Sequence, residues 1–181
     1  MTVDARLMTA EELAAMPDDG NRHELVNGEL LTMTPSFALH GMIAGLIASS
    51  LGHHVSTNRL GHVLVADAGY LLQRGPDTVR APDVSFVRKG RAIEDAFLSG
   101  APDLAVEVLS SGDRAKQVEA KIGEYLRAGA QMVIVIDPRN ETASVHTAGS
   151  ITRLSIDDAL DGGDVVPGWR LPLRDLFETE V

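Results

Sequence analysis

Cysteine is absent from this chain of 181 residues. Its absence excludes disulfide bonds, thiol catalysis and cysteine-ligated zinc, and it fits a reducing compartment, so we expect a cytoplasmic protein. The N-terminus has no basic segment followed by an apolar one, so no signal peptide is predicted. No apolar run approaches the roughly 20 residues that span a bilayer, so no membrane partner is expected.

Basic residues are scarce relative to acidic ones. The chain has 16 Lys and Arg against 26 Asp and Glu, for a formal net charge of −10. Affinity for a nucleic-acid backbone comes largely from Lys and Arg. The charge therefore argues against strong non-specific DNA binding by the monomer, although basic residues can cluster locally and a metal site itself carries negative charge before its cation binds.

The length and apolar content are those of one domain. Hydrophobic residues make up 44% of the chain, enough for a substantial core at this length. No repeat, linker or low-complexity segment interrupts the sequence. We therefore expect residues 1–181 to form a single domain.

Turn and capping residues define the elements of the first half. Residues 9–12 predict a helix cap, with Pro17 ending the short helix that follows. Asn27-Gly28 between two apolar runs predicts a β-hairpin, because both residues accept positive φ. A helix is predicted over 36–55, and strands over 61–66 and 69–73. The apolar stripe of the predicted helix 36–55 contains Leu39, Ile43, Leu46, Ile47 and Leu51.

The second half predicts a βαβ unit. Residues 103–109 and 132–136 are apolar runs typical of buried strands, and 113–128 between them is a helix ended by Gly129. Before this unit, 88–100 is predicted to be a loop with a short helix. After it, the sequence predicts a hairpin from 142–146 and 151–155, and a tail that packs back on the body through Trp169, Leu171, Leu173, Leu176 and Phe177.

Two acidic residues lie in apolar runs, where burial of a charge is costly. Asp83 opens the run 83–87, and Glu107 lies within 103–109. Such residues are tolerated when they are paired or bind a metal. Two carboxylates followed by a helix with a lysine suit magnesium-dependent phosphodiester cleavage. The alternatives are a strand-start cap for Asp83 and a buried, arginine-paired carboxylate for Glu107.

Geometry separates the other candidate acids from this pair. Asp103 and Glu107 share a strand face about 13 Å apart, too far to bind one magnesium ion at about 2.1 Å. Asp77 lies in a turn-like segment and is predicted to be a turn residue. Asp83 begins its own strand, so it can lie beside Glu107 on a neighbouring strand.

The lysine must come from the following helix. Many nucleases of this chemistry have a lysine two residues after the glutamate, where this chain has Leu109. At about 100° per residue, Lys116 lies opposite the apolar stripe of helix 113–128, whereas Lys121 lies on its shoulder. Lys121 is therefore the candidate that orients water and stabilises charge on a phosphate. The alternative is an ordinary lysine of an amphipathic helix.

Glu24 and His40 are two further candidates. Glu24 precedes the hairpin turn, where a solvated strand-face glutamate is the default interpretation. His40 shares the inner helix face with Ile43 and Ile47, so it points inward or at a site. A single core-facing histidine is more often a hydrogen-bonded structural residue than a ligand.

Taken together, several motifs resemble the Uma family of restriction endonucleases in the PD-(D/E)xK nuclease superfamily. They are residues 22–30, 80–87, 102–110 and 135–138, Lys121 followed by Tyr125, and the tail at 167–177. The resemblance implies an α/β (α+β) restriction-endonuclease-like fold with a mixed central sheet flanked by helices and an N-terminal hairpin. It also implies a divalent metal, phosphodiester hydrolysis, and a lysine moved from the strand to the following helix.

The same resemblance implies roles for individual residues. Asp83 and Glu107 would ligate Mg²⁺ or Mn²⁺, and Lys121 would complete the catalytic set. Glu24 and His40 would be accessory catalytic residues. DNA is the expected substrate, and we also consider a homodimer.

The chain departs from the family pattern at a few positions. Ser111 replaces a usual proline, Gln117 replaces a usual aspartate one helical turn before Lys121, and Gln131 and Met132 replace aromatic residues. Gln117 and the acidic charge favour a second hypothesis, a non-catalytic module that acts through a protein partner or as a dimer. A third hypothesis is a metal-dependent hydrolase of a smaller phosphate ester.

Overall fold

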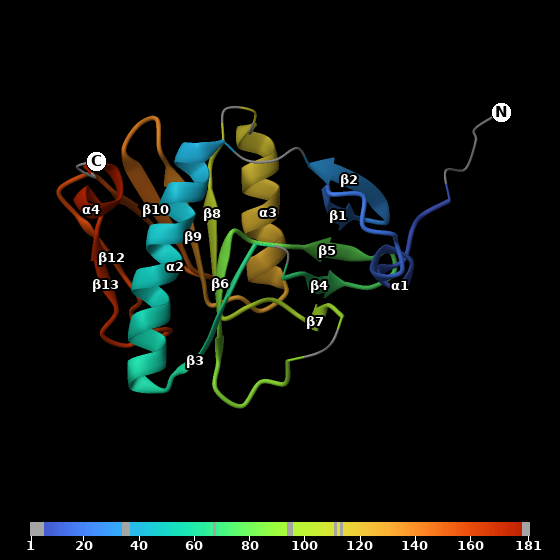
Figure 1. The fold of residues 1–181 in the computed structure, drawn as a ribbon, viewed down its shortest axis with the longest axis horizontal. Coiled ribbons are helices and arrows are strands. Elements are labelled where there is room, and N and C mark those ends of the chain that lie inside the picture. Colours follow the sequence, from blue (N-terminus) through green and yellow to red (C-terminus); the bar gives the residue numbers. More distant parts are fainter. Residues whose placement is uncertain are drawn as a thin grey trace.

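Two β-sheets with flanking helices organise the chain in the computed structural model (Figure 1). The structure describes residues 6–33, 37–66, 68–93, 96–110, 112 and 114–178. The helices are α1 (Ala10–Ala14), α2 (Ala38–Asn58), α3 (Ala115–Arg127) and α4 (Arg174–Phe177).

The strands of the first sheet lie in the order β2 (Glu29–Met33), β1 (Arg22–Val26), β5 (Thr78–Arg80), β4 (Tyr70–Gln73) and β7 (Leu98–Ser99). Those of the second sheet lie in the order β11 (Ile151–Leu154), β10 (Thr142–His146), β9 (Met132–Asp137), β8 (Leu104–Val108), β6 (Val84–Arg88) and β3 (Gly61–Val65). A separate antiparallel pair is formed by β12 (Ala159–Asp161) and β13 (Arg170–Pro172).

The helix cap and the hairpin predicted near the N-terminus are both present in the structure. Thr9 and Glu12 make a capping box at the start of α1, in which each side chain accepts from the other's backbone N–H. Asn27 and Gly28 adopt φ of 52° and 80° and join β1 to β2 as an antiparallel hairpin. A Cβ added at Gly28 would lie 2.7 Å from that of Leu7, so the turn also needs glycine for space.

The predicted βαβ unit is confirmed. Strands β8 and β9 pair in parallel, and α3 is the connection between them. The other pairings in the second sheet are antiparallel, so this sheet is mixed, as expected. Gly129 follows α3 with φ of 104°, a conformation that a glycine adopts without strain.

The two faces of the second sheet are covered by different helices. On one face, Ile43, Ile47 and Leu51 of α2 pack with β6, β8 and the C-terminal tail. The tail residues Trp169, Leu171, Leu173 and Leu176 are buried and Phe177 is partly buried, as predicted. On the opposite face, Ile122 and Tyr125 of α3 pack on β8 and β9. The two helices therefore meet the sheet at neighbouring strands from opposite sides.

Some sequence predictions need correction. Leu39 was expected in the core but is 50% exposed, because it lies in the first turn of α2, outside the buried residues that begin with Ile43. No helix occurs in the described part of 88–100, where β7 pairs with β4 instead. The predicted helix starts at Ser36 and Asp113 lie outside the described residues. The short strands β5, β12 and β13 were not predicted, since three residues are too few to show a period.

Within the described ranges, no helix combines the length and the apolar character needed to cross a bilayer. The longest, α2, has 21 residues.

Candidate active site

The backbone pairing of β6 with β8 brings Asp83 and Glu107 to one sheet face. Val84 pairs with Val106, and the N–H of Asp83 donates to the Val106 carbonyl at 3.0 Å. Continuing this register by one residue sets Asp83 opposite Glu107, and directly opposed side chains share a face. Both residues are buried, with 7% and 8% of their surface exposed.

Asp83 is held as a carboxylate by three donors. Arg22 Nη1 lies 3.2 Å from Oδ1, while His40 Nε2 and the Val108 N–H lie 3.1 and 2.8 Å from Oδ2. Burial raises the pKa of Asp83, but His40, Val108 and Arg22 together outweigh burial and lower it. Asp83 is therefore more than a cap of local backbone groups at the start of its strand, because the backbone N–H that donates to it belongs to Val108 of β8.

Glu107 is held by two side chains from α3. Lys121 Nζ lies 3.3 and 3.1 Å from its two carboxylate oxygens, and the Tyr125 hydroxyl donates to Oε1 at 2.8 Å. Burial raises the pKa of Glu107, and Asp83 and Glu24 raise it further against the opposing effects of Lys121 and Tyr125. The alternative of an arginine-paired Glu107 is wrong, since a lysine and a tyrosine occupy that place.

The helical face of α3 separates the two candidate lysines. Lys121 and Tyr125 are one turn apart and both reach Glu107. Lys116 is exposed, as its position opposite the apolar stripe predicts, and Gln117 is exposed as well. Burial lowers the pKa of Lys121, but the carboxylates of Glu107 and Glu24 outweigh this and raise it, so the ammonium keeps its charge. Gln117 is not among the residues that fix Lys121.

Glu24 belongs to this site, and its default interpretation as a solvated residue is wrong. Only 1% of its surface is exposed. Its Oε1 lies 3.3 Å from Lys121 Nζ and accepts the Ala81 N–H at 3.1 Å, while its Oε2 accepts from Arg80 Nη1 at 2.8 Å. Burial raises the pKa of Glu24, but Lys121, Arg80 and the Ala81 N–H outweigh it and lower the pKa.

Sequence reasoning missed two members of this network, Arg80 and Glu124. Arg80 is buried on β5 and donates from Nε to Glu124 Oε2 at 2.6 Å, in addition to its bond with Glu24. Burial lowers the pKa of Arg80, but the two glutamates raise it well above its ordinary value. The only available signals were that Arg80 begins the motif 80–87 and that Glu124 lies one turn after Lys121.

The two aspartates set aside in the sequence make other contacts. Asp103 accepts from the Arg88 backbone and side chain and from Gln131. Asp77, beyond its place in a turn, accepts the Ala10 N–H at 2.8 Å and so anchors the start of α1.

The donor set fits a divalent cation of the oxygen-seeking kind. Asp83 and Glu107 are two buried carboxylates on one face, and carboxylate oxygens are the ligands that Mg²⁺ and Mn²⁺ prefer. Over the described residues, no three His, Asp or Glu side chains group closely enough to hold a metal. A cation here would therefore depend on two protein carboxylates, with water or a substrate phosphate completing its shell, as is common for Mg²⁺.

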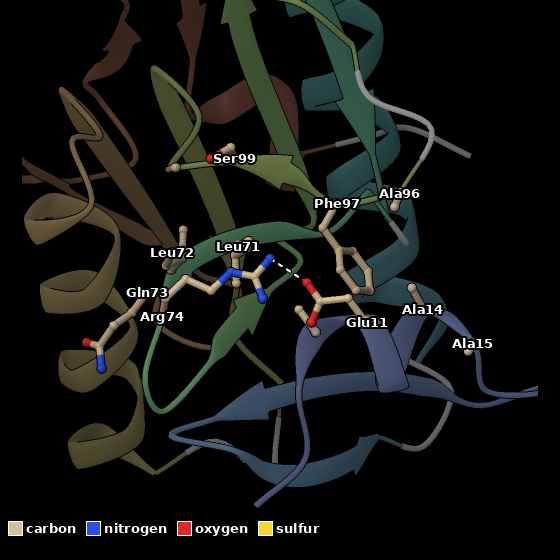
Figure 2. Close-up of a pocket in the computed structure, with 12 residues that line it drawn as sticks. Glu11, Ala14, Ala15, Leu71, Leu72, Gln73, Arg74, Ala96, Phe97 and Ser99 are labelled. Atoms are coloured by element: carbon tan, nitrogen blue, oxygen red, sulfur yellow. Dashed lines mark ion pairs between the residues drawn. The ribbon is translucent and has the colours of Figure 1, made fainter.

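A surface pocket of about 730 Å³ lies apart from these residues (Figure 2). It lies between α1, β4 and the segment leading into β7, and Figure 2 shows Glu11 and Arg74 joined across it, with Nη2 and Oε1 2.6 Å apart. The lining contains none of Asp83, Glu107 or Lys121. The chemically distinctive cluster is therefore the buried carboxylate site and not this pocket.

Comparison with known proteins agrees with the fold. Residues 10–174 match the model of the Uma2 family, described as "Putative restriction endonuclease". The chain therefore belongs to the Uma2 family. A crystal structure of a protein titled "putative nuclease belonging to DUF820", from Anabaena variabilis, is similar with a TM-score of 0.81 and 21% sequence identity, covering 94% of this chain and 98% of that one. No curated protein gives a significant match.

Proposed function

We propose that this protein is a metal-dependent endonuclease that hydrolyses DNA phosphodiester bonds. The observation that carries the proposal is the meeting of Asp83, Glu107 and Lys121 at neighbouring ends of β6 and β8, with Lys121 Nζ 3.1 Å from Glu107 Oε2. The family description supports nuclease chemistry.

Asp83 and Glu107 would hold Mg²⁺ or Mn²⁺. When bound, such a cation supplies positive charge that polarises the scissile phosphate and lowers the pKa of an attacking water. The two carboxylates differ in their surroundings, since Asp83 is stabilised as an anion and the pKa of Glu107 is raised. The surrounding residues thus stabilise the negative charge of Glu107 less than that of Asp83.

Lys121 would stabilise the charge that develops on the phosphate. Its ammonium group is positioned by Glu107 and Glu24 at 3.1 and 3.3 Å, so it needs little reorganisation during the reaction. Tyr125 fixes Glu107 by donating to Oε1, and Arg80 fixes Glu24. His40 donates from Nε2 to Asp83 Oδ2 at 3.1 Å and would orient that carboxylate.

Plasmid cleavage by purified protein in Mg²⁺ or Mn²⁺ tests the proposal. Asp83→Asn, Glu107→Gln and Lys121→Ala are each expected to lower the rate by about 100-fold or more, because each removes charge at the reacting centre. Lys116→Ala is the matched control, since this lysine lies exposed on the same helix.

Two outcomes would contradict the proposal. Equal cleavage by the wild type and the three variants would point to a contaminating nuclease. No cleavage by the folded wild-type protein with either metal would remove the assignment.

A second candidate function is a non-catalytic module that acts through a protein partner or as a homodimer. The observation that favours it is that basic side chains of the protein already neutralise the site carboxylates. Asp83 pairs with Arg22, Glu107 with Lys121, and Glu24 with Arg80 and Lys121. Calorimetric titration with Mg²⁺ and Mn²⁺ separates the two functions. Absence of binding at millimolar metal, with the fold intact, would support the module, and light scattering would then report the oligomeric state.

A further inference from the structure

Arg22 uses only part of its hydrogen-bonding capacity. Its Nη1 donates to Asp83 Oδ1 at 3.2 Å. Its Nε and Nη2 are buried, and neither has a hydrogen-bond partner among the described residues. A buried donor without a partner costs about 1–3 kcal/mol, and more when it is charged. A purely structural role for Arg22 leaves these two donors unexplained.

The two unpaired nitrogens form one edge of the guanidinium. The Nε and Nη2 groups of arginine point in parallel and match two oxygens of a carboxylate or a phosphate. No carboxylate occupies that edge in the described part of the chain, although Arg22 lies near Asp83, Glu24 and Glu107, whose charges together raise its pKa despite its burial. An external anion is the group that would satisfy it.

The position of Arg22 on β1 sets its side chain beside the proposed reaction centre. Arg22 and Glu24 are two residues apart on one strand, so they share a face about 7 Å apart. Arg22 contacts Asp83, whereas Glu24 contacts Lys121. One strand face thus connects both ends of the site.

We propose that Arg22 is a phosphate-binding residue, which receives a non-bridging oxygen pair of the substrate on its Nε–Nη2 edge. This inference rests on the proposed function for the identity of the substrate. The edge is buried in the structure, so access of a phosphate to it requires the Arg22 side chain to turn outward. Asp83 keeps His40 and the Val108 N–H as partners when Arg22 turns.

Variants of Arg22 separate this role from simple neutralisation of Asp83. Arg22→Gln removes both the positive charge and the paired N–H donors of the Nε–Nη2 edge. Arg22→Lys keeps the charge beside Asp83 but loses the paired donors. Arg170→Gln is the matched control, because Arg170 also pairs with an aspartate, Asp161, at 3.5 Å but is 70% exposed on β13.

Two measurements report on these variants. The first is the dependence of the plasmid cleavage rate on DNA concentration in Mg²⁺, which gives KM and kcat. The second is calorimetric binding of inorganic phosphate. Both Arg22 variants are expected to raise KM, and the Kd for phosphate, by roughly 10- to 100-fold, as expected for loss of charge-assisted hydrogen bonds. Arg170→Gln is expected to leave both unchanged, and circular dichroism verifies the fold of each variant.

The outcomes distinguish the inference from the proposed function. If Arg22→Lys or Arg22→Gln cleaves DNA with the wild-type KM and binds phosphate equally well, Arg22 does not bind phosphate, while the nuclease assignment stands. If the wild type cleaves no DNA but binds phosphate in an Arg22-dependent way, the function falls and the inference stands. If the folded wild type neither cleaves DNA nor binds phosphate, the proposed function and the role of Arg22 are both overturned.

Discussion

At the scale of single residues, Glu24 is the carboxylate on which the charge network converges. It contacts Lys121 and Arg80 while almost completely buried. A buried ion pair is sensitive to loss of one partner, because the remaining charge stays desolvated. Glu24 therefore links stability to the arrangement of the site.

Glu24→Gln is expected to lower the free energy of unfolding by about 3 kcal/mol at neutral pH, since it leaves two buried cations undercompensated. The folded pKa of Glu24 lies below its ordinary value of 4.5. The stabilisation is therefore complete above that value and is lost as the pH falls through the folded pKa. Urea unfolding at neutral and acidic pH measures the difference, which is expected to narrow in acid. Glu29→Gln, an exposed change in the same hairpin, is the control and is expected to have little effect.

Tyr125→Phe removes one donor from Glu107 and keeps the packing of the ring. Because the hydroxyl bonds to a carboxylate at 2.8 Å, we expect about 1.5–3 kcal/mol of lost stability and a slower reaction. Tyr70→Phe is the comparison, since the Tyr70 hydroxyl bonds to the neutral Ser85 at 2.7 Å. Tyr70→Phe is expected to lower the free energy of unfolding by about 1 kcal/mol and to leave the cleavage rate unchanged. Denaturant unfolding and plasmid cleavage measure both, and equal losses of activity would contradict a role for Tyr125.

At the scale of elements, Arg80 ties β5 to β1 and to α3 through two carboxylates. The position of Lys121 depends on this connection, because Glu24 is bound to both cations. One buried guanidinium thus holds together three elements that the βαβ unit alone does not join.

Arg80→Lys is expected to fold less stably, by about 3 kcal/mol, because a single ammonium cannot replace the fork that reaches Glu24 and Glu124. DNA cleavage is expected to fall as well, since Glu24 loses its fixed partner. Arg88→Lys is the control, for its side chain is half exposed and pairs with Asp103 at the far end of β6. Thermal unfolding and cleavage rates test the pair, and a fully active Arg80→Lys would exclude a positioning role.

Local patterns were sufficient to predict most elements and part of the site. Asn27-Gly28 fixes its turn through backbone conformation, and helical periodicity separates Lys121 from Lys116. Arg80 could not be assigned in this way, because its partners lie 56 and 44 residues away along the chain. The burial of Glu24 depends on these same long-range contacts.

At the scale of the whole molecule, the net charge of −10 limits how DNA can bind. Each phosphate neutralised by the protein contributes about −0.9 to the slope of log affinity against log salt concentration. With Arg22 and Lys121 as the cations at the proposed site, we expect a shallow slope of roughly −2. Fluorescence anisotropy with a labelled duplex over a salt series measures it. A slope several times steeper would require a basic surface that this site does not supply.

The site is divided between the two sheets, and this division has a mechanical consequence. Arg22 and Glu24 lie on β1 of the first sheet, whereas Glu107 lies on β8 of the second and Asp83 directly precedes β6 of that sheet. Figure 1 shows the two sheets side by side. Proteins open through sub-global units that cost less than complete unfolding. Fraying of the β1–β2 hairpin would therefore abolish activity while the α2-covered core stays closed. On heating, we expect cleavage to be lost at a lower temperature than the near-ultraviolet signal of Trp169, which is buried in that core.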